Sequence, residues 1–79
     1  MTRDEWLDRF AAVAGVEAPD NEEAEALLEL AGAAARASER TAAPLTCWLA
    51  AKAGIAPADA LVMARQLAAA PGDTPSERG

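Results

Sequence analysis

The sequence has 79 residues, enough for one small domain, and a formal net charge of −6 from thirteen acidic against seven basic residues. It has no histidine and one cysteine, which excludes a zinc site or disulfide framework within the chain and any nucleophile that needs a histidine base. A chain this acidic is poorly suited to sequence-independent nucleic-acid binding or to an anionic membrane surface.

The first predicted helix covers residues 3–14. Thr2 and Glu5 form a T-x-x-E capping box before it, and Gly15 is the expected left-handed stop after it. Apolar residues recur at helical spacing and predict an inward-facing stripe made of Trp6, Phe10 and Val13, widened by Leu7 and Ala14.

The second predicted helix covers residues 21–39, with Asp20 as its N-cap and Glu23 completing another capping box. Gly32 lies in an alanine-rich run, so we expect another helix to approach closely there. The residues predicted to face the core are Ala24, Leu27, Leu28, Ala31 and Ala35.

Two shorter helices are predicted next, over residues 44–53 and 57–70. Pro44 suits a first helical turn and predicts a tight junction over 41–43, while Gly54 ends the third helix. The predicted inner face of the third helix is Leu45, Trp48 and Leu49. That of the fourth is Ala60, Met63, Ala64 and Leu67, with Leu61 and Ala68 beside it.

These elements predict an all-α fold, a compact four-helix domain over residues 1–70 with short loops. Residues 71–79 contain no apolar side chain and are predicted to be a flexible tail. Of the 41 apolar residues, 23 are alanine, so the core is expected to be small and its helices closely packed. A core of this size leaves room for weak self-association.

The charge is unevenly divided along the chain. Residues 1–30 carry nine acids and two bases, a net −7, whereas residues 31–70 carry two acids and four bases, a net +2. An acidic cluster surrounds the start of the second helix and consists of Glu17, Asp20, Glu22, Glu23, Glu25 and Glu29. We interpret it as a solvated face, with a secondary use as a docking surface for a basic partner. A lone Cys47 and the absence of a signal sequence predict a cytoplasmic protein.

The candidate binding residues gather at the junction between the second and third helices. Two arginines four residues apart would share a helical face, next to hydroxyl groups and a helix N-terminus that can hold a phosphate or carboxylate. The competing interpretation is that the arginines cap the second helix and pair with nearby acids. The candidates for a ligand or partner are Arg36, Arg40, Thr41, Pro44 and Thr46.

The segment over residues 31–54, AGAAARASERTAAPLTCWLAAKAG, resembles a family of small helical domains from high-GC Gram-positive bacteria. The shared pattern is a helix ending in arginine, then x-Ala-Ala-Pro-Leu-Thr, then an apolar helix closed by glycine. Members are often labelled with molybdenum cofactor guanylyltransferase, or with molybdopterin-guanine dinucleotide biosynthesis. Members often have histidine where this chain has Arg36 and proline where it has Thr41.

This resemblance implies a context and no activity, because the guanylyltransferase requires a glycine-rich phosphate loop that this chain lacks. The function predicted is a non-enzymatic accessory or protein-interaction domain linked to molybdenum cofactor biosynthesis or insertion. It needs no cofactor or metal, and its partner would be a molybdenum enzyme or a cofactor-assembly protein. The alternative is a domain that binds a small anion, phosphate or pterin through Arg40 and the N-terminus of the third helix.

Overall fold

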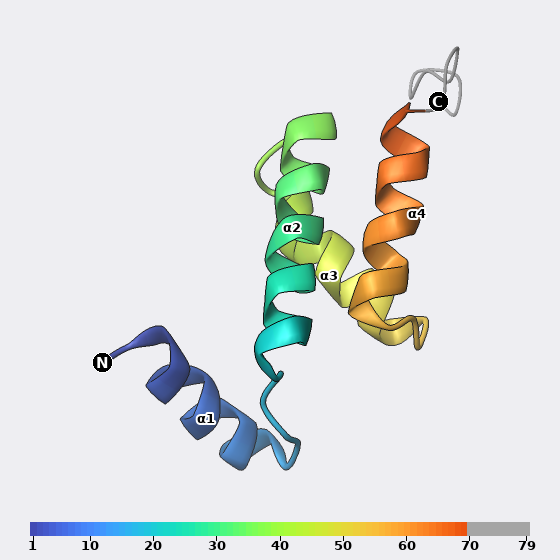
Figure 1. Ribbon diagram of the computed structural model, residues 1–79. Helices are drawn as coiled ribbons and strands as arrows, with labels where there is room; N and C mark the ends of the chain where they lie inside the picture. Colours follow the sequence, from blue (N-terminus) through green and yellow to red (C-terminus); the bar gives the residue numbers. More distant parts are fainter. Residues whose placement is uncertain (70–79) are drawn as a thin grey trace.

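The computed structural model describes residues 1–69, which form four helices: α1 (Arg3–Ala14), α2 (Asn21–Ala37), α3 (Ala42–Lys52) and α4 (Pro57–Ala69) (Figure 1). No strand occurs among these residues, so the predicted all-α class with four short helices is confirmed. The tail predicted for 71–79 lies outside the described residues. Within residues 1–69, no helix combines the length and the apolarity needed to cross a membrane.

Both predicted capping boxes are present. Before α1, the Thr2 and Glu5 side chains accept hydrogen bonds from each other's backbone N–H groups at 3.1 and 2.9 Å. Before α2, Asp20 and Glu23 do the same at 2.8 and 2.9 Å. Each box satisfies two N–H groups that a helix start leaves without an intrahelical partner, which explains why both helices begin where predicted.

The junction between α2 and α3 differs from the prediction. Helix α2 ends at Ala37, two residues early, and α3 begins at Ala42, two residues before the predicted start at Pro44. Ala43 is helical although a proline follows it, which the sequence argument had excluded. Pro44 is tolerated because it lies in the first turn, where an N–H group has no intrahelical carbonyl to bond.

The core forms where α2 packs against both α3 and α4 (Figure 1). In the view of Figure 1, α2 and α4 run side by side and α3 crosses behind them. Leu30 is 1% exposed and is the largest fully buried side chain, and its buried neighbours are Ala50, Ala60 and Leu61. Partly buried residues complete the cluster: Leu27, Cys47, Ile55 and Ala64.

Most of the large residues predicted to face the core are exposed instead. Leu28 in α2, all three predicted residues of α3, and Met63 and Leu67 in α4 have at least half of their surface accessible. The helices meet through alanine, which lets their backbones approach closely, and this arrangement turns bulky side chains outward. The prediction missed Leu30 because it weighed side-chain size and spacing without knowing which faces meet.

Helix α1 lies to one side of the other three helices and makes little contact with them (Figure 1). Its contacting side consists of the buried Ala11 and the half-buried Leu7, one turn apart. The predicted stripe of Trp6, Phe10 and Val13 lies on the exposed side and is 55% to 89% accessible. The sequence therefore predicted the helix and the inward side chain of Leu7 correctly, and the centre of the inward face wrongly.

Candidate functional site

The predicted binding residues lie at the surface around the end of α2 and the start of α3. Arg36 is in the last turn of α2, whereas Arg40 lies in the turn that follows. The two arginines therefore do not share a helical face, which corrects the expectation from their spacing. Thr41 and Pro44 are exposed and Thr46 is half-buried.

Arg36 folds back along its own helix. Its Nη1 atom lies 3.0 Å from the point that a Cβ on Gly32 would occupy. The space beside Gly32 is thus taken by a side chain of α2 and not by the neighbouring helix that the sequence predicted. Within residues 1–69, neither Arg36 nor Arg40 forms a salt bridge or a side-chain hydrogen bond.

The N-terminus of α3 has few amides to offer an anion. The N–H of Ala42 donates to the Glu39 carbonyl at 2.9 Å, and the N–H of Ala43 donates to the Arg40 carbonyl at 3.1 Å. Pro44, the third residue of the helix, has no N–H. The side chain of Thr41 makes no capping bond either. Arg40 is consequently the main source of positive charge at this helix start.

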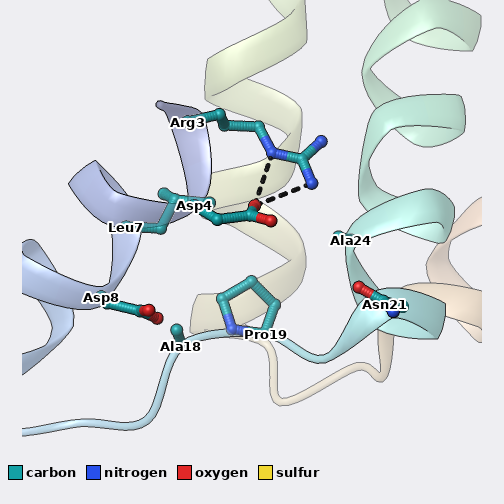
Figure 2. A pocket seen from close by; sticks show the side chains of 8 residues that line it. All are labelled: Arg3, Asp4, Leu7, Asp8, Ala18, Pro19, Asn21 and Ala24. Carbon is teal, nitrogen blue, oxygen red and sulfur yellow. Dashed lines mark hydrogen bonds and ion pairs between the residues drawn. The ribbon is translucent and has the colours of Figure 1, made fainter. Parts of the chain in front are cut away.

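A small hollow lies between α1 and the start of α2, away from the arginine junction (Figure 2). Its volume is about 160 Å³, below the range of roughly 300–1,000 Å³ typical of small-molecule sites. Figure 2 shows the carboxylate of Asp4 at its edge, paired with Arg3 at 2.9 Å. The size and the paired charges give no sign of an organic ligand there.

The acidic cluster has structural roles. Asp20 and Glu23 form the α2 capping box, and Glu29 pairs with Arg65 of α4 at 2.9 Å, both side chains being well exposed. In the part of the chain that the structure describes, no three acidic or cysteine side chains are arranged to hold a metal ion.

Cys47 belongs to the core. Its Sγ lies 3.9 Å from the Leu27 carbonyl oxygen, to which the thiol donates a weak hydrogen bond. Burial raises the pKa of the Cys47 thiol above its ordinary value of 9.0. The thiol therefore stays protonated at neutral pH, which is unfavourable for a nucleophile or a metal ligand.

Two exposed apolar faces are the main feature of the surface. Both consist of residues that were predicted from the sequence to face the core. One is the α1 face, made of Trp6, Phe10 and Val13, where the two rings lie 6.0 Å apart. The other is the α3 face, made of Leu45, Trp48 and Leu49. At the α3 face, Lys52 Nζ lies 5.1 Å from the Trp48 ring centroid, a cation–π distance.

A signal for the α3 face was present in the sequence. Residues 42–52 are apolar around the whole circumference of the helix, with a single charge at Lys52. Such a helix is typical of one that is covered on every side. Here α2 covers only the side with Thr46, Cys47 and Ala50, which leaves the opposite side accessible.

Fold and surface together define a small all-α domain with an alanine-lined core and large apolar side chains on its outside. Residues 1–75 match a family described as a domain of unknown function (DUF6457), and this match over nearly the whole chain shows that the protein belongs to that family. No curated protein and no solved structure matches the chain. The family description names no activity or partner, so the link to molybdenum cofactor biosynthesis stays a prediction.

Proposed function

We propose that this protein is a non-enzymatic protein-interaction domain. One observation carries the proposal: its large apolar side chains, both tryptophans included, are mostly on the surface while alanine fills much of the core. Contiguous exposed apolar surface marks protein contact sites in soluble proteins. Tryptophan is also among the residues that contribute most to binding energy at interfaces.

The available chemistry supports a binding role over catalysis. The sequence has no histidine to act as a base near neutral pH. Its only thiol is partly buried against the core, and this burial raises its pKa. Of the acidic side chains around α2, Asp20 and Glu23 are engaged in the cap and Glu29 in an exposed ion pair.

The partner class we propose is a molybdenum enzyme or a protein of molybdenum cofactor assembly, in the cytoplasm. This assignment rests on the resemblance of residues 31–54 to domains carrying that label. The contact region would combine Arg40 with the neighbouring α3 face, because an arginine beside exposed apolar and aromatic side chains is a typical interface composition.

The alternative function, binding of a small anion or pterin at Arg40, has weaker support. Ala42 and Ala43 already donate their N–H groups to backbone carbonyls, and Pro44 has none to donate. Calorimetric titration with inorganic phosphate tests it: heat that saturates with wild type and vanishes with Arg40→Ala would favour this alternative.

The interaction proposal is tested by affinity capture from the native host, read by mass spectrometry. Wild type should retain a molybdenum enzyme or cofactor-assembly protein, and both Arg40→Ala and Leu49→Asp should lose it. Val62→Asp is the matched control, since Val62 is 51% exposed on α4, outside the proposed contact region. Capture of the same proteins by all four chains would contradict the proposed surface, and capture of none would contradict the proposed partner class.

A further inference from the structure

The α1 face and the α3 face are two separate apolar surfaces on one chain. The three residues of the α1 face are spaced at i, i+4 and i+7 and point away from the side that carries Ala11. The three residues of the α3 face are 59% to 63% exposed and point away from α2. Neither face has a covering element among residues 1–69.

Helix α1 is poorly supported by its own chain. It has 12 residues, a length at which an isolated helix is marginal in water even with good caps. Only its Leu7 and Ala11 side is buried to any extent. Additional packing on the α1 face would therefore stabilise the helix.

The two faces match in size. An aromatic side chain presents on the order of 200 Å² and an aliphatic one somewhat less, so the exposed fractions leave up to roughly 400 Å² on each face. If each chain places its α1 face on the α3 face of the other, a two-fold dimer buries up to roughly 1,600 Å², the size of a standard stable interface. A two-fold axis makes both contacts at once, because it is self-complementary.

The net charges of the two helices are opposite in sign. Helix α1 carries three acids and two bases, a net −1, and α3 carries only Lys52, a net +1. Arg3 is already paired with Asp4, whereas Lys52 borders the α3 face over the Trp48 ring. The acids Asp4 and Asp8, however, line the hollow towards α2 and lie away from the α1 face. Pairing through one face alone would bury only about 800 Å², so the buried area, and not charge, favours the reciprocal contact of α1 on α3.

We propose that two copies of this chain form a two-fold dimer in which the α1 face of each copy packs on the α3 face of the other. This inference rests on the proposed interaction function: a second copy occupies the α3 face that is also proposed for the host partner, so the two compete for it. The contact completes the burial of α1 and covers the remaining side of α3, so both tryptophans enter the interface.

Sedimentation equilibrium from micromolar to millimolar concentration tests the dimer. Wild type should approach twice the chain mass of 8.1 kDa, and Phe10→Asp or Leu49→Asp should each raise the dimer dissociation constant at least tenfold. Val62→Asp, the control on α4, should dimerise like wild type. Circular dichroism checks that each variant keeps its helices, and Val13→Asp replaces Phe10→Asp if α1 unfolds.

Mixing the two variants tests which faces meet. Each variant alone lacks both contacts, whereas a heterodimer of Phe10→Asp with Leu49→Asp retains one intact α1–α3 contact. The mixture should therefore associate more tightly than either variant alone. Equal association in the mixture and in the separate variants would mean that like faces pair, which overturns the proposal.

Tryptophan emission gives a second readout. The single-tryptophan variants Trp6→Phe and Trp48→Phe should both shift to shorter wavelength as concentration rises. A wild-type chain that stays monomeric at every concentration overturns the dimer. So does Trp6 emission that is already at the shorter wavelength in the monomer, because α1 would then pack on α3 of its own chain. A monomer that still captures its host partner overturns the dimer and leaves the proposed function standing. A dimer that captures no host partner supports the dimer and contradicts the proposed partner class.

Discussion

At the scale of single residues, the thiol of Cys47 makes the stability of the fold depend on pH. Burial raises the pKa of its thiol above 9.0, so the folded chain holds this proton more tightly than the unfolded chain. The resulting stability is fully present below pH 9, where both states are protonated, and is lost as pH rises through the folded-state pKa. We expect the urea midpoint of wild type to fall more steeply above pH 9 than that of Cys47→Ala. Parallel profiles for the two chains would contradict this role.

Gly32 offers a second test at the residue scale. It lies inside α2, where replacing glycine by alanine gains up to about 1 kcal/mol of helix propensity. The new Cβ would lie 3.0 Å from Arg36 Nη1, the end of a flexible exposed side chain that can move away. Gly32→Ala should therefore raise the thermal midpoint. Gly54→Ala is the control and should lower it, because Gly54, between α3 and α4, has φ 73° and alanine is strained there.

At the scale of the element, the two capping boxes have the same chemistry in different settings. Asp20 starts α2, which carries the core contacts with α3 and α4, whereas Thr2 starts the little-supported α1. Asp20→Ala should cost about 1 kcal/mol of global unfolding free energy. Thr2→Ala should fray α1 and leave the global value nearly unchanged. Circular dichroism at 222 nm during urea titration separates the two effects, and equal losses of stability would show that α1 belongs to the cooperative core.

The helices were predictable because their ends depend on neighbouring residues. Thr2 with Glu5, Asp20 with Glu23, and the left-handed glycines 15 and 54 are local signals, and the structure confirms them. The start of α3 was predicted wrongly because the turn carbonyls of Glu39 and Arg40, which sequence does not show, accept the first N–H groups.

The inward faces were less predictable because they depend on which helices meet. Apolar side chains line α3 on both sides, so spacing alone could not choose between Trp48 and Ala50. The structure buries the alanine, since close backbone approach to α2 requires a small residue. The same uncertainty affected the candidate site: the arginines were correctly predicted at the surface, but the apolar face beside them was assigned to the core.

At the scale of the whole molecule, one leucine carries much of the stability. A domain of this size rarely obtains more than about 3–5 kcal/mol from its core, and here Leu30 is the largest fully buried side chain. Most other large apolar residues contribute little in the isolated chain because they remain half exposed. The surface contacts proposed above would therefore add a substantial share of the folding free energy.

Two leucines of α2 test this division of roles. Leu30 is 1% exposed and Leu28 is 58% exposed, and they lie two residues apart in the same helix. Leu30→Ala should cost about 2–5 kcal/mol, enough to unfold much of the population, because it removes transfer free energy and leaves a cavity. Leu28→Ala should cost less than about 1 kcal/mol, since its side chain is already largely in water. Urea denaturation at low protein concentration measures both in the monomer. A large loss for Leu28→Ala that appears only at high concentration would show that association covers this side chain as well.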